Sequence, residues 1–277
     1  MLPFSRPDTF QAGPGPLTPE HRLLLFSPDG RTVQAPGPDG WPRLDEVPTE
    51  TLHEPAVSLG CWQGQSYAAA RSRTDLAAGL SLRQLITTHE VEAGLAGYAA
   101  QVLDFHSTHR FCGRCATSTD ALGHELARRC PACGLTVYPR VAPAVMVLIW
   151  RRQGAGREFL LARGPRHAPG LFSVVAGFTE PSETLEACCH REVLEELGVT
   201  IRSPEYVMSQ PWPLPHSLMV AFSAEYVGGE IVPQPGEIEE ARWFSAQDLP
   251  QIPAPYSCAY HLIHQGVAES VTLRPGL

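Results

Sequence analysis

The sequence contains no lysine, so all 21 of its basic residues are arginines. They are outnumbered by 29 acidic residues, which gives a formal net charge of −8 at pH 7. An acidic chain is poorly suited to hold a nucleic-acid backbone over a broad surface, because that binding depends on many cationic contacts to phosphates. The charge balance leaves room only for a local basic pocket.

Long apolar runs are missing as well. The first 19 residues hold no apolar segment of the kind found in a secretion signal, and nothing later approaches the roughly 18 unbroken apolar residues of a membrane span. The chain has no internal repeat and no low-complexity tract. We therefore expect a soluble cytoplasmic protein without a membrane partner. Its 277 residues, 43% of them hydrophobic, suffice for about two domains with a buried core.

Three parts are expected along the chain. Residues 1–108 form a small strand-rich domain, since short apolar runs alternate with Pro/Gly turns, and helical spacing appears over 81–106. Residues 109–139 carry two cysteine pairs. Residues 140–277 mix strands and helices in an α+β order. The elements expected there are a hairpin of YPRVAPAVMVLIW with EFLLARG, a strand at LFSVVAGF, an acidic helix, a strand at HSLMVAFSAEYV and a final helix at SCAYHLIHQGVAE.

Two C-x-x-C motifs stand 14 residues apart in FCGRCATSTDALGHELARRCPACG. Four thiolates satisfy tetrahedral Zn²⁺, and the glycine within or after each motif permits a tight turn. A filled ligand set makes the ion structural. The predicted zinc ligands are Cys112, Cys115, Cys130 and Cys133.

A redox-active pair is the alternative for these cysteines. It would place one motif at the junction of a strand and a helix, which the pattern here does not. Zinc ribbons also serve as nucleic-acid or protein-binding modules, so that reading stays open. The other cysteines are interpreted as ordinary small core or surface residues: Cys61, Cys188, Cys189 and Cys258.

Six glutamates crowd the segment GFTEPSETLEACCHREVLEELGVT, residues 177–200. Glu192, Glu195 and Glu196 follow the i, i+3, i+4 spacing that puts their carboxylates on one helical face, where they repel unless a cation lies among them. A solvated acidic face is the plain alternative. Arg191 projects to another side, and we expect it to bond Glu183, outside the cluster.

The same segment carries signals for both ends of a helix. Leu185, Val193 and Leu197 supply an apolar face. Gly198 is a typical glycine just past a helix C-terminus, and Pro181 with Ser182 are expected to start the helix. These features favour a packed helix whose acidic face has a function.

The spacing G-x5-E-x7-R-E-U-x-E-E-x-G-U, with U an aliphatic residue, is fulfilled from Gly177 to Val199 and resembles the full motif of Nudix hydrolases. The resemblance implies an α/β/α sandwich and cleavage of a nucleoside diphosphate linked to a further group, with Mg²⁺ or Mn²⁺ supplying the missing positive charge. It makes Glu192 and Glu196 metal ligands, and Glu195 a ligand or base. Glu183 and Arg191 would lock the loop to the helix.

A proline-spaced stretch, SQPWPLPHSLMVAF, follows over residues 209–222. Prolines lower the entropy of a loop and hold the side chains between them ready for a ligand. A stiffened surface loop with a buried tryptophan is the alternative. The stretch is similar to the SQPWPFPxS signature of NADH pyrophosphatases, with Leu214 in place of phenylalanine.

That resemblance extends to the four-cysteine ribbon, the YPRVAP junction and the N-terminal module. It implies hydrolysis of NAD(H) to NMN(H) and AMP, removal of NAD caps from RNA 5′ ends, and a homodimer. Implied substrate contacts are Arg83, Glu125, Tyr138, Ala176, Phe178, Gln210, Pro211, Trp212, Pro213, Leu214, Pro215, His216, Ser217, Glu237 and Ala259. Ala176 and Glu237 are also implied as ligands of Mg²⁺ or Mn²⁺.

Two alternatives remain at this stage. An enzyme specific for ADP-ribose or diadenosine polyphosphates would have the same Nudix motif and a different proline stretch. A catalytically silent nucleotide-sensing or nucleic-acid-binding module would belong to a different class of protein. The Nudix motif retains all of its carboxylates, which argues against the catalytically silent module.

Overall fold

The computed structural model describes residues 3–154 and 156–272, and it divides into two compact units. The first unit comprises Pro3–Val141 together with Trp212–His216. The second comprises Ala142–Pro211 and the chain from Ser217 onward. No helix within the described ranges is long and apolar enough to cross a bilayer.

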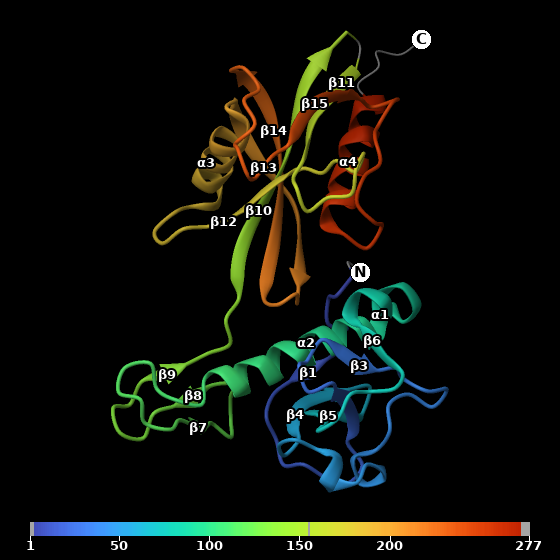
Figure 1. The fold of residues 1–277 in the computed structure, drawn as a ribbon, viewed down its shortest axis with the longest axis vertical. Coiled ribbons are helices and arrows are strands. Elements are labelled where there is room, and N and C mark those ends of the chain that lie inside the picture. The colour runs from blue at the N-terminus through green and yellow to red at the C-terminus, as the bar shows by residue number, and fades with distance from the viewer. Residues whose placement is uncertain (1–2, 155, 273–277) are drawn as a thin grey trace. The chain divides into compact units, whose positions relative to one another are not determined.

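The first unit contains a six-stranded sheet of order β1-β4-β5-β2-β3-β6 (Figure 1). Its pairs are antiparallel except β2 with β5, which run parallel. The apolar runs of the N-terminal domain form these strands, as predicted. The strands are β1(Gln11–Ala12), β2(Arg22–Phe26), β3(Thr32–Gln34), β4(Val57–Trp62), β5(Gln65–Arg71) and β6(Gly79–Ser81), with 3-10 turns at Leu44–Glu46 and Thr49–Thr51.

Two helices follow the sheet: α1(Leu82–Thr88) and α2(Glu90–Thr108). A capping box starts α1, because the Ser81 hydroxyl accepts from the Gln84 N–H and the Gln84 side chain accepts from the Ser81 N–H. The chain then enters a small three-stranded antiparallel sheet, β7(Asp120–Ala121), β8(Arg128–Arg129) and β9(Thr136–Val137), which joins the two cysteine pairs.

The second unit is built around β10(Ala142–Gln153), as Figure 1 shows. Its last residues form the predicted hairpin with β11(Gly156–Arg163), and its first residues pair with β12(Val175–Phe178). On its other edge β10 runs parallel to β14(Ser217–Gly228). The path through the sheet is β13-β14-β10-β11-β15, with β13(Thr200–Trp212) and β15(Glu240–Ser245) at the edges.

Alternation along β10 explains why helices cover both faces of this sheet. Val145, Val147 and Ile149 pack in one core cluster with α3(Leu185–Leu197), whereas Met146 and Leu148 pack in another with α4(Cys258–Thr272). Successive strand residues point to opposite faces, so a continuous apolar strand requires a helix on each side. The result is the α/β/α sandwich that was predicted.

The acidic helix α3 begins three residues later than the expected start signals. Its N-cap is Thr184, whose hydroxyl accepts from the Ala187 N–H at 3.1 Å. Ser182 instead lies in the preceding turn with a left-handed φ of 66°. The predicted start at Pro181 and Ser182 is therefore wrong, while the predicted end is right, since Gly198 closes the helix with φ 71°.

Gly266 provides a test of the packing between α4 and the sheet. A methyl group there would lie 2.5 Å from Leu148 Cδ2 and 3.0 Å from Phe159 Cε1, both on fully buried side chains. We expect Gly266→Ala to lower the free energy of unfolding by about 1–3 kcal/mol through overpacking. Gly228→Ala is the matched control, because nothing lies within 4 Å of its added carbon. Equal stability of the two variants in urea would contradict this packing.

Candidate active site

The Nudix-like motif folds as a strand, a turn and a helix. Strand β12 carries Ala176 and Gly177, and α3 carries the glutamates. The Glu192 carboxylate lies directly over Gly177, because a Cβ built on that glycine would stand 1.9 Å from Glu192 Cδ. The glycine is therefore required for the close approach of a carboxylate to the strand.

Arg191 ties this motif together. Its Nε and Nη2 donate to the two Glu183 oxygens at 2.7 and 2.9 Å, and Nη2 also donates to the Phe178 carbonyl at 2.9 Å. Its Nη1 donates to Glu192 at 2.8 Å and to Glu195 at 3.0 Å. The predicted Glu183 partner is present. The expectation that Arg191 points away from the cluster is wrong, since its guanidinium bonds Glu183 and also the cluster residues Glu192 and Glu195.

Arg191 also sets the acidity of Glu183. Its hydrogen bonds, followed by the N–H of Glu180 at 2.9 Å, lower the pKa of the Glu183 carboxyl to about 2. This carboxyl is therefore ionised at neutral pH. It stabilises the turn before α3 and is not suited to act as an acid or base.

Glu196 has the opposite environment. Burial, and then the negative charges of Glu192, Glu237 and Glu195, raise its pKa to about 7. None of the hydrogen bonds of Arg191 reaches it. The side chain lines a pocket of about 410 Å³ together with Ala176 and Glu237.

This donor set fits a hard divalent cation. Carboxylate oxygens are the ligands that Mg²⁺ and Mn²⁺ prefer, and a cation beside Glu196 would remove the repulsion that raises its pKa. The structure thus brings Ala176, Glu196 and Glu237 to one pocket. Within the described ranges, the four ribbon cysteines are the only group of three or more metal-ligating side chains whose ligand atoms all lie within 4.8 Å of one another. No three carboxylates of the described residues form such a group.

The ribbon cysteines form a compact site in the first unit. The ligand sulfurs of Cys112, Cys115, Cys130 and Cys133 all lie within 4.8 Å of one another. The sulfurs of Cys112 and Cys133, and those of Cys115 and Cys130, are 3.5 Å apart. A tetrahedral ion with bonds of about 2.3 Å requires sulfurs slightly less than 4 Å apart, so the group fits zinc.

The two cysteine turns are equivalent. The Ala116 N–H bonds the Cys112 carbonyl at 2.8 Å, and the Gly134 N–H bonds the Cys130 carbonyl at 3.0 Å. Both turn residues are left-handed, with φ 60° for Ala116 and 74° for Gly134. In the first turn that role falls to alanine, and not to the glycine inside the motif. The Thr117 hydroxyl and N–H lower the pKa of the Cys115 thiol to about 6, which favours the thiolate.

The proline stretch is mostly strand. Ser209, Gln210, Pro211 and Trp212 complete β13, residues 213–216 turn, and Ser217 begins β14. Gln210 is fully buried, and its amide donates to the Tyr256 carbonyl at 2.9 Å. The described contacts of Gln210 are therefore internal.

The tip of this hairpin, Trp212–His216, belongs to the first unit. The Trp212 ring meets Phe4 edge-on with centroids 5.4 Å apart, and the Arg83 guanidinium stands 6.0 Å from the same ring. Arg83 lines a pocket of about 490 Å³ in this unit with Pro213, Leu214 and Pro215. These predicted substrate contacts are thus neighbours.

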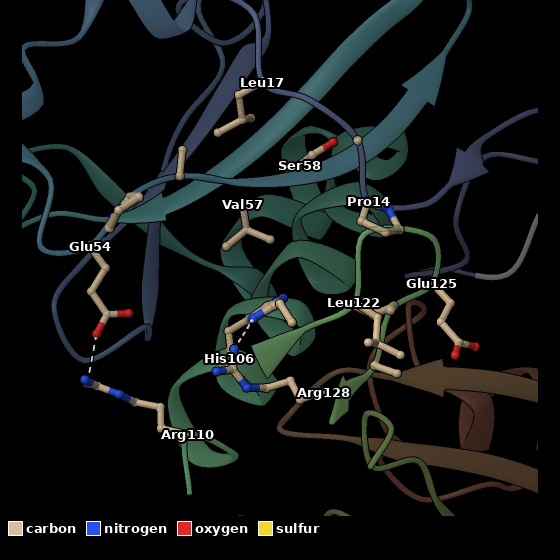
Figure 2. A pocket seen from close by; sticks show the side chains of 16 residues that line it. Pro14, Leu17, Glu54, Val57, Ser58, His106, Arg110, Leu122, Glu125 and Arg128 are labelled. Atoms are coloured by element: carbon tan, nitrogen blue, oxygen red, sulfur yellow. Dashed lines mark hydrogen bonds and ion pairs between the residues drawn. The ribbon is translucent and has the colours of Figure 1, made fainter. Parts of the chain in front are cut away.

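Glu125 and Tyr138 form a second group in the first unit, where the Tyr138 hydroxyl lies 3.5 Å from the Glu125 carboxylate. Glu125 stands at the rim of a pocket of about 550 Å³ lined by residues of the N-terminal domain and the ribbon, as Figure 2 shows. Dashed lines there mark Arg128 bonded to His106 at 3.2 Å and Arg110 paired with Glu54. The charged side chains of this pocket thus largely satisfy one another.

The remaining predicted contacts belong to the second unit. Phe178 is 57% exposed at the end of β12, where its ring is available for stacking, whereas Ala259 is buried in α4. Sequence reasoning missed two residues that line the pocket of Glu196: Arg166 and His167. Their only signal was the segment PRH directly after the predicted strand EFLLARG, and this segment has no periodic pattern.

Comparison with known proteins agrees with these features. A model of the NUDIX domain matches residues 140–264, and a model of the NADH pyrophosphatase zinc ribbon domain matches residues 107–138. A relative from Pseudomonas aeruginosa, named NAD-capped RNA hydrolase NudC, is 41% identical over 96% of this chain and 95% of its own length. The chain belongs to the Nudix family. The recognition of a Nudix fold with an NADH pyrophosphatase zinc ribbon is therefore confirmed.

Two further matches concern parts of this Nudix protein. The NAD-capped RNA hydrolase NudC of Deinococcus radiodurans is 59% identical over 63% of this chain, and the match spans 62% of that relative's length. The crystal structure of a NUDIX hydrolase from Nitrosomonas europaea aligns with a TM-score of 0.50 at 23% identity, covering 61% of this chain and 96% of that one. The second match supports the fold alone.

The ribbon predicts one zinc ion per chain. Elemental analysis of protein purified without added metal should show it, and Cys130→Ser should lose it because three thiolates leave the tetrahedron incomplete. Cys61→Ser is the matched control, since Cys61 lies outside the cluster. A Cys130→Ser protein with full zinc content would contradict the site.

The Glu183–Arg191 pair predicts a pH-dependent stability. The folded pKa of about 2 lies below the ordinary 4.5, so the pair stabilises the fold above pH 4.5 and loses this effect as the pH falls toward 2. Urea unfolding should therefore show Glu183→Gln less stable than wild type at pH 7, with the difference shrinking between pH 4.5 and 2. Glu205→Gln, at an exposed strand position, serves as control. A difference that is constant with pH would refute the account.

Proposed function

We propose that this protein hydrolyses the diphosphate of NAD(H) to give NMN(H) and AMP, and removes NAD caps from RNA 5′ ends by the same reaction. The observation that carries the proposal is Glu196 of the Nudix motif, which receives no bond from Arg191, has its pKa raised to about 7 by burial and by Glu192, Glu237 and Glu195, and lines a pocket together with Glu237. The similarity to NAD-capped RNA hydrolases over nearly the whole chain supports the choice of substrate.

Glu192, Glu196 and Glu237 would hold Mg²⁺ or Mn²⁺, with Glu195 and the Ala176 carbonyl as further ligands. When bound, the cation neutralises charge on the diphosphate and activates water. The ribbon zinc is structural, because its four thiolates leave no open coordination position.

The chain's own residues perform the remaining tasks. Arg191 and Glu183 hold the strand, turn and helix in one arrangement, so that the carboxylates are positioned before substrate arrives. Water attacks one phosphorus and forms a new P–O bond, while the bridging P–O bond breaks and its electron pair leaves with the other phosphate. Glu195, whose side chain is 52% exposed, is open to a solvent water and takes the proton.

We assign recognition of the two nucleotides to the residues that the family resemblance implies. Phe178 and Tyr138, each 57% exposed, offer flat faces to a nicotinamide or adenine ring. The other proposed contacts are Arg83, Glu125, residues 210–217 and Ala259. We also propose a homodimer, the three-part division at 108 and 139, and a cytoplasmic location, where zinc thiolates stay reduced.

The substrate is tested by incubating the protein with Mg²⁺ or Mn²⁺ and either NADH or ADP-ribose, and separating the products. Equal amounts of NMNH and AMP from NADH, with ADP-ribose a poor substrate, are expected. A preference for ADP-ribose would keep the Nudix reaction and replace NAD(H) by ADP-ribose as the substrate. Turnover of neither would refute the enzymatic proposal and favour a nucleotide-binding module.

Glu196→Gln tests the metal assignment. We expect loss of at least about 100-fold in kcat, because an amide does not supply the charge that a ligand carboxylate does. Glu205→Gln, an exposed glutamate on β13, should retain full activity. Zinc content and the thermal midpoint are measured for both variants. A Glu196→Gln enzyme that keeps most of its rate would remove this residue from the site.

A further inference from the structure

The loop between β11 and β12 lines one wall of the pocket that holds Glu196 and Glu237. It contributes Gly164, Pro165, Arg166 and His167 to that wall. The pocket is therefore lined by two glutamates and one arginine. No residue of this loop belongs to the Nudix motif.

The loop has a defined shape. The His167 N–H donates to the Gly164 carbonyl at 3.0 Å, and the Gly164 N–H donates to His167 Nδ1 at 3.2 Å. A Cβ on Gly164 would stand 2.7 Å from the Glu237 carbonyl, so the loop backbone packs against the segment that carries Glu237. Arg166 is thus held at a fixed point along the pocket wall.

The charge of Arg166 is left free. The neighbouring Arg163 is paired with Glu239 and lies 3.8 Å from Glu240. Arg166 has no ion pair or side-chain hydrogen bond within the residues that the structure describes, and it is the single arginine among the described residues lining this pocket.

His167 does not supply a second cation. Its Nδ1 accepts the Gly164 N–H, which leaves Nε2 to carry the ring proton. Burial, and then the charges of Arg166 and Arg163, lower its pKa, so the ring is neutral at pH 7. The pocket wall therefore presents one guanidinium beside a neutral imidazole.

Building on the proposed function, we propose that Arg166, which lines the same pocket as Glu196 and Glu237, binds the non-bridging oxygens of the substrate diphosphate. A diphosphate carries two negative charges, which a guanidinium can help to neutralise beside a cation held by the carboxylates. A planar guanidinium donates two parallel hydrogen bonds to a phosphate, so it holds the group in register as well as neutralising it. His167 acts as a positioning residue that fixes the loop.

Because the diphosphate is charged both before and during the reaction, this contact is made in the ground state as well as in the transition state. Removing it is expected to raise KM more than it lowers kcat. Arg166→Gln should raise KM for NADH by about 10–100-fold, the range for a lost charge-assisted hydrogen bond. Arg166→Lys should recover part of the affinity, since lysine keeps the charge and loses the fork.

Arg152→Gln is the matched control. Arg152 is an exposed arginine of the same unit at the end of β10, and it does not line the pocket. Its KM should equal that of wild type. Thermal melting of all three variants reports folding, and if Arg166→Gln does not fold, the comparison of Arg166→Lys with wild type decides the question.

Binding is also measured without turnover. NADH fluorescence titrated with Glu196→Gln protein gives a Kd, and adding Arg166→Gln to that background should weaken binding by the same 10–100-fold. If wild type hydrolyses NADH and Arg166→Gln matches Arg152→Gln in KM and Kd, the role of Arg166 is refuted while the proposed function stands. If wild type does not hydrolyse NADH, the proposed function itself is refuted.

Discussion

The arrangement of this active-site region depends on one charge network, the fork that Arg191 forms with Glu183, Glu192 and Glu195. Like carboxylates three and four positions apart destabilise a helix unless a cation is placed among them. Arg191 meets that need from inside the helix itself. Its bond to the Phe178 carbonyl extends the same constraint to strand β12, so the strand, the turn and the helix are fixed together.

The network divides the glutamates into two classes. Glu183 becomes a strong acid that only holds structure, whereas Glu196 is left outside the fork with its pKa raised to about 7. A helix can tolerate this because its other face is anchored in a core cluster through Cys188, Val193 and Leu197. Packing energy on one face thus stabilises an arrangement that is electrostatically unfavourable on the other, as is common where a site awaits a cation.

Much of this was predictable from sequence, and the reasons are physical. The sandwich follows from the apolar strand β10 and two amphipathic helices, and the motif from Gly177 to Val199 has a fixed spacing. The extra bonds of Arg191 were not predictable, because spacing gives the side of a helix and not the rotamer of a long side chain. The start of α3 was misplaced because Ser182 and Thr184 both suit a cap.

Other residues were hidden for different reasons. An arginine in a loop, such as Arg166, has no periodic signal, and its role follows only from the pocket wall that it shares with Glu196. The sequence also gives no sign that the buried amide of Gln210 donates to the Tyr256 carbonyl, which only the structure shows. Polar residues in irregular segments are therefore the ones for which coordinates add most.

The proposed reaction requires that Glu196 and its neighbours form a binding site for a divalent cation. Titration of the protein with Mn²⁺, followed by the electron paramagnetic resonance signal of free Mn²⁺, measures this without substrate. We expect saturable binding to wild type, and binding at least tenfold weaker to Glu196→Gln protein that retains its zinc. Equal Mn²⁺ binding by the two proteins, or none by wild type, would contradict it.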